Sequence, residues 1–130
     1  MKIAALQMDL AWEDRATNHA RARELATKAR DAGAGLIVLP EMFATGFSMN
    51  PALTAEDPEG PTPTFLRTLA RDLQTAVVGG YVRRCAGGRG RNTALTVGPD
   101  GRDRAEYGKT HLIAALGEDA AHVAGDAPAV

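Results

Sequence analysis

The stretch "LIVLPEMFATGFSMNP", residues 36–51, determines the expected fold and raises the first functional question. Its four consecutive apolar residues, Leu36 to Leu39, predict a strand that is buried on both faces, as central strands of parallel sheets are. Pro40 follows the apolar run, and the carboxylate of Glu41 comes directly after it. Glu41 is therefore either a solvated loop residue or a catalytic base placed at the end of a buried strand.

The segments on either side of this strand alternate between strand and helix patterns. Residues 17–35 and 62–74 carry apolar stripes at helical spacing, with Gly33 ending the first helix and Thr62 as the expected N-cap of the second. Prolines and acidic residues predict a loop over 49–61. The expected strands are residues 2–9, 36–40, 76–82, 92–97 and 102–109. This β-α-β-α-β order followed by a β-meander predicts an α/β fold with a mixed sheet.

The composition is that of an ordinary soluble globular domain. The chain has 130 residues, 45% of them hydrophobic and 24% charged, and a net charge of −1. No strong field is expected to attract nucleic acid or a membrane surface, and no apolar run approaches the roughly 20 residues that a membrane span needs. A cytoplasmic location is expected. The single cysteine, Cys85, excludes an internal disulfide and a multi-cysteine metal site.

The expected crossovers have a consequence for the two faces of the sheet. If both right-handed connections run in one direction, both helices cover the same face and the other face is left without a cover. A doubly wound strand order would instead cover both faces. The pattern of residues leaves both arrangements open.

Two charged residues, Glu41 and Lys109, follow the ends of expected strands. Taken singly, each is more often a surface charge. In open α/β folds, however, sites are built at strand ends, where a carboxylate and an ammonium could act as general base and electrostatic stabiliser. We expect these two groups to lie within about 6 Å, the range in which opposite charges shift each other's pKa.

A nucleophile is not evident in the residues around this pair. Cys85 ends an apolar strand beside two arginines, and no base lies near it in the sequence, so we expect it to be dispensable. The histidines at 19, 111 and 122 lack metal-ligand spacing, so surface or packing roles are expected. We expect neither a metal nor a cofactor.

The motifs "LPEMFATGFSM" and "YGKTHL", in this order, resemble the nitrilase or carbon-nitrogen hydrolase superfamily, and most closely its ω-amidase-like branch. The resemblance implies an α-β-β-α sandwich and a Glu-Lys-Cys triad. Glu41 would be the general base, Lys109 would stabilise the tetrahedral intermediate, and Glu118 would be a second glutamate that orients the lysine. Other stretches that resemble the family are "IAALQMDLAWEDRATNHARA", "PTPTFLRTLARDLQTAVVGGYVRR", "RNTALTVGPDGR" and "GEDAAHVAGD".

The chain departs from the family pattern at the nucleophile. The family's cysteine lies beyond the lysine in a "C-Y-D-x-R-F-P"-like elbow, whereas Cys85 precedes Lys109. Residues 1–130 therefore resemble the N-terminal half of a single carbon-nitrogen hydrolase domain, whose second half would supply the facing sheet.

Two functions follow as expectations. The first is hydrolysis of a small amide, an ω-amide of a dicarboxylic or 2-oxo acid, by a homo-oligomer whose cysteine lies beyond this chain. The second is a truncated, non-catalytic remnant that serves as an interaction or assembly module through its uncovered sheet.

Overall fold

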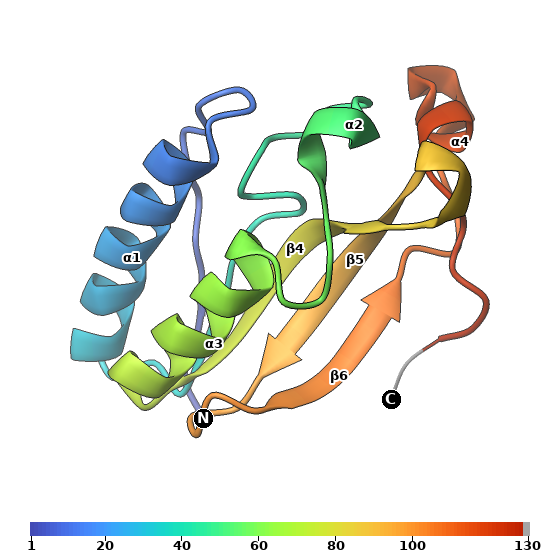
Figure 1. The fold of residues 1–130 in the computed structure, drawn as a ribbon. Coiled ribbons are helices and arrows are strands. Elements are labelled where there is room, and N and C mark those ends of the chain that lie inside the picture. Colours follow the sequence, from blue (N-terminus) through green and yellow to red (C-terminus); the bar gives the residue numbers. More distant parts are fainter. Residues whose placement is uncertain (129–130) are drawn as a thin grey trace.

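The computed structural model describes residues 1–128 as one mixed sheet with two long helices packed on it (Figure 1). Strands β1, β2 and β4 run parallel, β4, β5 and β6 are antiparallel neighbours, and the order along the sheet is β1-β2-β4-β5-β6, with β3 paired to β4. The expected α/β fold with a mixed sheet is confirmed. The strands are β1 (Ile3–Ala5), β2 (Leu36–Val38), β3 (Ala55–Glu56), β4 (Ala76–Arg84), β5 (Gly90–Val97) and β6 (Asp103–Gly108). The helices are α1 (Arg15–Asp31), α2 (Pro51–Thr54), α3 (Pro61–Leu73) and α4 (Glu118–Ala121), with 3-10 turns at Ala86–Gly88 and Ala114–Leu116.

Helix α1 starts two residues before the expected helix and also anchors the loop that carries Glu41. The carboxylate of Asp14 caps the helix by accepting a hydrogen bond from the Thr17 amide at 3.0 Å. The buried Asn18 side chain donates to the carbonyl of Ala44 at 2.9 Å and also bonds both backbone groups of Ala11. One amide side chain therefore fixes the segment after β2 against the first turn of the helix.

The start of α3 differs from the expectation that Thr62 is its N-cap. Gly60 is the N-cap residue, Pro61 is the first helical residue, and Thr62 is buried inside the first turn. The carboxylate of Glu56 does the capping: it accepts from the Thr62 amide and from the Thr62 hydroxyl, each at 2.6 Å. Glu56 can reach this turn because β3 pairs with the end of β4.

The expectation of an irregular loop over residues 49–61 is also wrong, because this segment contains α2 and β3. Strand β3 is only two residues long and exists through its pairing with β4, a long-range contact that local sequence does not encode. The pairing places Glu56 where Arg15 can form an ion pair with it at 2.6 Å.

Replacing Glu56 with alanine should lower the free energy of unfolding by about 3 kcal/mol. Only 5% of the Glu56 side chain is exposed, so its removal would leave the Arg15 guanidinium and the first turn of α3 without their carboxylate partner. Urea unfolding would measure the change. Glu59→Ala is the matched control, since that side chain is 86% exposed and its ion pair with Arg67 is worth about 1 kcal/mol or less. Equal losses in the two variants would contradict the capping role.

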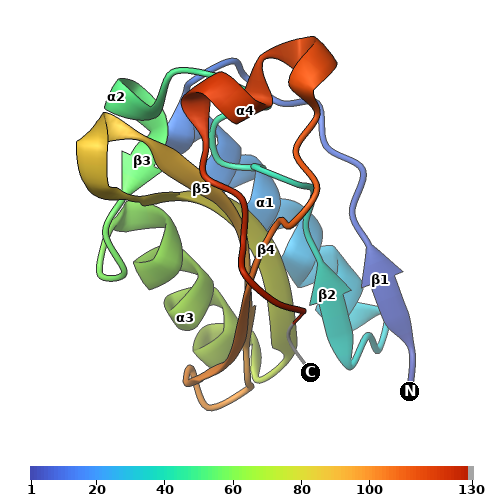
Figure 2. The same cartoon turned by 90° about the vertical axis from the view of Figure 1, so that its right-hand side faces the viewer.

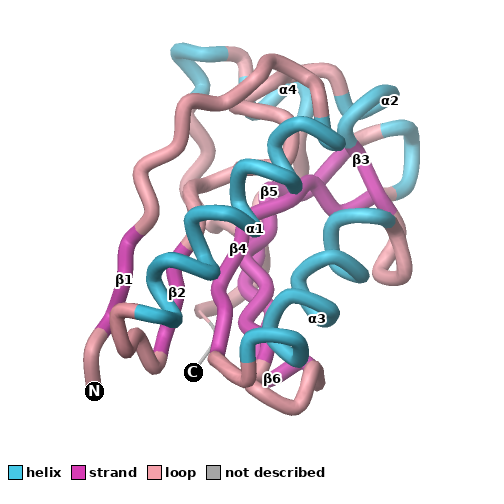
Figure 3. Tube along the Cα trace, turned by 90° about the vertical axis from the view of Figure 1, so that its left-hand side faces the viewer, coloured by secondary structure: helices cyan, strands magenta, loops and turns pink. Residues whose placement is uncertain are grey.

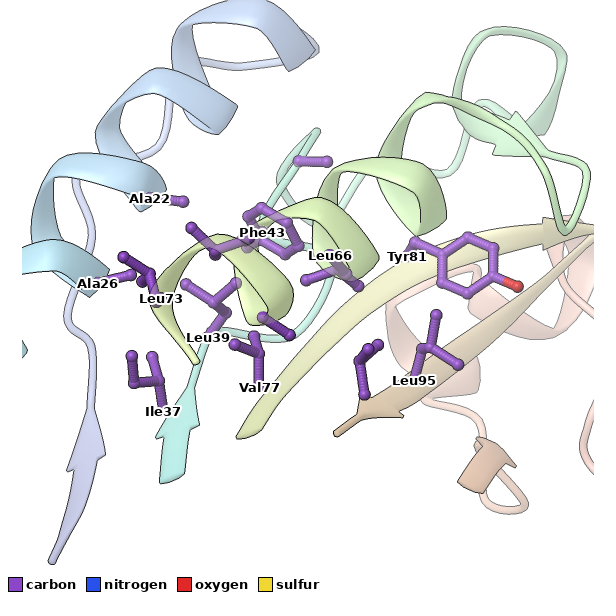
Figure 4. Packing of buried hydrophobic residues seen from close by; sticks show 14 of the residues in the cluster. Ala22, Ala26, Ile37, Leu39, Phe43, Leu66, Leu73, Val77, Tyr81 and Leu95 are labelled. Atoms are coloured by element: carbon purple, nitrogen blue, oxygen red, sulfur yellow. The ribbon is translucent and has the colours of Figure 1, made fainter. Parts of the chain in front are cut away.

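The hydrophobic core lies between the sheet and the two long helices (Figure 4). Helix α3 sits close to the sheet at Gly79, where a Cβ atom would come within 2.6 Å of a Leu66 methyl group. The core residues drawn in the figure include Ala22, Ala26, Ile37, Leu39, Phe43, Leu66, Leu73, Val77, Tyr81 and Leu95.

The two long helices lie on the same face of the sheet. Figure 3 shows α1 and α3 side by side in front of the strands, and Figure 2, from the opposite side, shows the strands in front of α1. This confirms the one-sided arrangement and excludes the doubly wound alternative. Neither long helix lies on the opposite face, which we call the open face; within residues 1–128 the short helix α4 is the one helix on that side, where its Glu118 meets Asn92 of β5 (Figure 2). By strand alternation the open face carries the side chains of Ile3, Ala5, Leu36, Val38, Ala76, Val78, Ala94 and Tyr107.

Candidate active site

Glu41 lies just past the end of β2, on the side of the open face. The Leu39 amide extends the pairing with β4 by donating to the Val78 carbonyl at 2.8 Å, and the chain then turns at Met42, whose φ is 47°. Gly80 on β4 allows this turn to approach, since a Cβ atom there would lie 2.6 Å from the Met42 nitrogen and 3.1 Å from the Glu41 Cα. The Glu41 side chain is 51% exposed.

Lys109 follows β6 and reaches Glu41. Its backbone amide donates to the Asn92 carbonyl at 2.8 Å, which continues the pairing of β6 with β5 by one residue. Its Nζ lies 3.0 Å from Oε1 of Glu41, well inside the expected 6 Å, so the proximity expected from the strand ends is confirmed. The same Nζ lies 5.1 Å from the centre of the Phe47 ring, a cation–π distance.

Glu118 is the first residue of α4 and its side chain is fully buried. Its Oε2 lies 2.9 Å from the Lys109 Nζ and accepts a hydrogen bond from the Ile113 amide at 2.8 Å. The structure therefore brings together the three residues singled out in the sequence, with the lysine ammonium between two carboxylates.

Asn92 is a fourth member of this cluster that the sequence analysis missed. The residue is buried on β5, and its Nδ2 donates to Oε1 of Glu41 at 2.5 Å and to Oε1 of Glu118 at 3.0 Å. One amide group thus bridges the two carboxylates. In the sequence, Asn92 is a polar residue in the strand that precedes the strand of Lys109 in the same hairpin. This position alone does not identify a site residue; the burial of Asn92, which the structure shows, does.

The charges in the cluster stabilise one another. Burial alone would lower the pKa of Lys109, but its contacts with Glu118 and Glu41 outweigh burial and raise it above the ordinary value. Burial likewise would raise the pKa of Glu118, but hydrogen bonds from Asn92, the Ile113 amide and Lys109 hold it below its ordinary value. At neutral pH the lysine is therefore a cation and Glu118 an anion.

A cavity of about 290 Å³ opens beside this cluster. Glu41, Lys109 and Asn92 form its polar end, and Val38, Val78, Ala94 and Tyr107 line the remainder from the open face. Such a mostly apolar hollow with a few convergent polar groups is typical of a small-molecule site. Cys85 does not line this cavity; its half-buried Sγ lies 3.8 Å from the Arg83 carbonyl.

Two further findings concern other kinds of site. Across residues 1–128, no three His, Cys, Asp or Glu side chains gather in a way that could hold a metal ion. None of the described helices is both long enough and apolar enough to cross a membrane.

The names of proteins with similar sequences include a nitrilase, several amidases and other hydrolases. The chain is 35% identical over 118 residues to a nitrilase from Pyrococcus abyssi, covering 87% of this chain and 44% of that protein. It is 36% identical over 127 residues to the omega-amidase YafV from Yersinia enterocolitica, covering 96% of this chain and 47% of that protein. The chain thus spans a little under half the length of these relatives.

A solved structure extends the similarity to the fold. The amidase from Nesterenkonia sp. AN1, a variant with acrylamide added to its active-site cysteine, superposes with a TM-score of 0.87 at 27% identity. The match covers 98% of this chain and 51% of that one. The family model for carbon-nitrogen hydrolases matches residues 2–126. By motif, fold and relatives, the chain belongs to the carbon-nitrogen hydrolase family, and omega-amidases are among its relatives.

Proposed function

We propose that this protein hydrolyses the C–N bond of a small amide, an ω-amide of a dicarboxylic or 2-oxo acid, through a Glu41-Lys109-cysteine triad whose cysteine lies outside residues 1–130. The observation that carries the proposal is the Lys109 ammonium held between Glu41 and Glu118 at the mouth of a small cavity. The similarity to proteins named as omega-amidases supports the substrate class.

Each charged group has a place in the proposed reaction. Glu41, half exposed and facing the cavity, accepts the thiol proton as the cysteine sulfur attacks the amide carbon. Lys109 stabilises the oxyanion of the tetrahedral intermediate. Glu41 then returns the proton to the departing nitrogen, ammonia leaves, and water activated by Glu41 hydrolyses the thioester to release the acid and the thiol.

Glu118 acts on the lysine rather than on the substrate. Its side chain is fully buried, and its carboxylate contacts the Lys109 Nζ at 2.9 Å. We propose that it holds the ammonium at the carboxyl ends of β2 and β6, so that the cation remains in place while Glu41 gains and loses a proton.

We also propose that residues 1–130 form the N-terminal half of a single hydrolase domain. Two observations support this: the relatives are about twice as long, and the open face carries apolar side chains next to the cavity. A second half that packs its own sheet on this face would bury those side chains and complete the α-β-β-α sandwich. A cytoplasmic homo-oligomer is proposed for the whole protein.

The alternative proposal is a non-catalytic remnant that binds a partner through the open face, which the exposed apolar residues on that face favour. Measuring ammonia release from succinamate and 2-oxoglutaramate by the protein as its gene encodes it separates the two proposals. Turnover of either amide supports the hydrolase, while no turnover by a well-folded protein with a complete sandwich would contradict it.

A further inference from the structure

His122 is the most unusual buried group outside the cluster of charges. It follows α4 directly, its side chain is fully buried, and neither ring nitrogen has a hydrogen-bond partner among the described residues. Buried polar atoms are almost always partnered, so an imidazole with two free nitrogens needs a physical explanation.

Backbone contacts, not the ring nitrogens, hold His122 in place. The Val123 amide donates to the Gly90 carbonyl at 2.7 Å, and the Arg89 guanidinium donates to the carbonyls of His122 and Asp119. Gly90 lies against the ring, since a Cβ atom there would come within 2.9 Å of the His122 Cδ2. These contacts hold the backbone of His122 beside α4 without using the ring nitrogens.

The ring faces Glu118, the carboxylate that orients the lysine. The His122 Nδ1 lies 3.9 Å from Oε1 of Glu118, just beyond hydrogen-bond distance. That oxygen already accepts from Asn92, while the other oxygen of Glu118 contacts Lys109. A shift of about 1 Å would bring Nδ1 into hydrogen-bond range.

Burial, together with two neighbouring cations, favours the neutral ring of His122. Burial lowers its pKa below the ordinary value of 6.5, Glu118 acts in the opposite direction, and the cations Lys109 and Arg89 lower it further. The ring is thus neutral at neutral pH and gains a proton only on acidification.

We propose that His122 is a positioning residue that controls how firmly Glu118 holds Lys109. When the ring is neutral, the Glu118 carboxylate contacts Lys109, at 2.9 Å, and makes no hydrogen bond with His122, at 3.9 Å. A protonated ring donates from Nδ1 to Glu118, weakens its hold on the lysine, and lets the ammonium pair more closely with Glu41. Glu41 is then a weaker base, so acidification reduces the rate before Glu41 itself is protonated. This inference rests on the proposed function.

The test compares pH profiles of kcat/KM for the protein as its gene encodes it. On acidification, kcat/KM of each variant falls below its own plateau value. In His122→Phe and in His122→Asn we expect the half-plateau point at a pH about half a unit to one unit lower than in the unmodified protein. The two replacements differ in shape and polarity, so a packing defect would not shift both half-plateau points alike. His111→Asn, which changes an exposed histidine, should leave the half-plateau point in place. Coincident half-plateau points for the protein and both His122 variants would overturn the proposal.

A second measurement does not depend on turnover. Imidazole ¹⁵N chemical shifts should show His122 titrating below pH 6.5, and Glu118→Gln should lower that midpoint further because the attraction of the carboxylate is lost. An unchanged midpoint would show that the two groups are not coupled. If no amide is hydrolysed but the midpoint moves, the proposed function fails while the coupling stands.

Discussion

Glu41→Gln should reduce kcat for ω-amide hydrolysis by about 10³-fold in the protein as its gene encodes it. Glutamine keeps the size of the side chain, and its carbonyl oxygen can still accept hydrogen bonds from Lys109 and Asn92, the present donors to Oε1. It cannot accept the thiol proton, so the nucleophile would remain mostly a neutral thiol. Steady-state ammonia release measures the loss.

Cys85→Ser is the matched control for this experiment. The Cys85 thiol does not line the cavity, and its only described hydrogen bond goes to the backbone of Arg83. We therefore expect kcat to stay within about twofold of the unmodified protein. Loss of turnover in Cys85→Ser alone would overturn our assignment of the nucleophile to a residue beyond this chain, and full activity in Glu41→Gln would overturn the general base.

The proximity of Glu41 and Lys109 was predictable because it follows from topology. Both residues come directly after a strand, and strand ends gather at one region of an open sheet. Glu118 had no such local signal: it follows the irregular segment after Lys109, and only the resemblance to a known family indicated it. The structure explains its position by the contacts with Lys109, Asn92 and the Ile113 amide.

The features that the sequence did not reveal depend on long-range contacts. Thr62 has the residue type of an N-cap, but the carboxylate of Glu56 occupies that role through the pairing of β3 with β4. Asn92 and His122 look ordinary in the sequence, where one belongs to a hairpin and the other to the C-terminal segment. Their importance comes from burial next to Glu118, which tertiary structure alone creates.

Residues 1–130 alone should not hydrolyse ω-amides at a rate above background. Glu41 can accept a proton and Lys109 can stabilise an oxyanion, but neither supplies the covalent step. Direct attack of water would forgo the acyl-enzyme route, which divides one difficult step into two easier ones. Ammonia release from the isolated chain, beside that of the protein as its gene encodes it, measures the difference.

The open face should also make the isolated chain self-associate. Ile3 on this face is 57% exposed, and Leu36, Val38, Val78 and Ala94 are only partly covered. Burying a few hundred Å² of apolar surface is worth several kcal/mol at roughly 25 cal/mol per Å². This is a large share of a net stability of about 5–15 kcal/mol, so we expect the isolated chain to cover its open face by pairing with that of a second copy.

Light scattering on a pair of charge variants locates the associating surface. Ile3→Lys places an ammonium on the open face and should shift the isolated chain toward the monomer. Leu53→Lys is the matched control, because Leu53 is similarly exposed at 51% but lies on α2, away from the strands of that face. Equal effects of the two variants would show that association does not use the open face. Robust turnover by a monomeric isolated chain would contradict both parts of the prediction and would require a nucleophile within these residues.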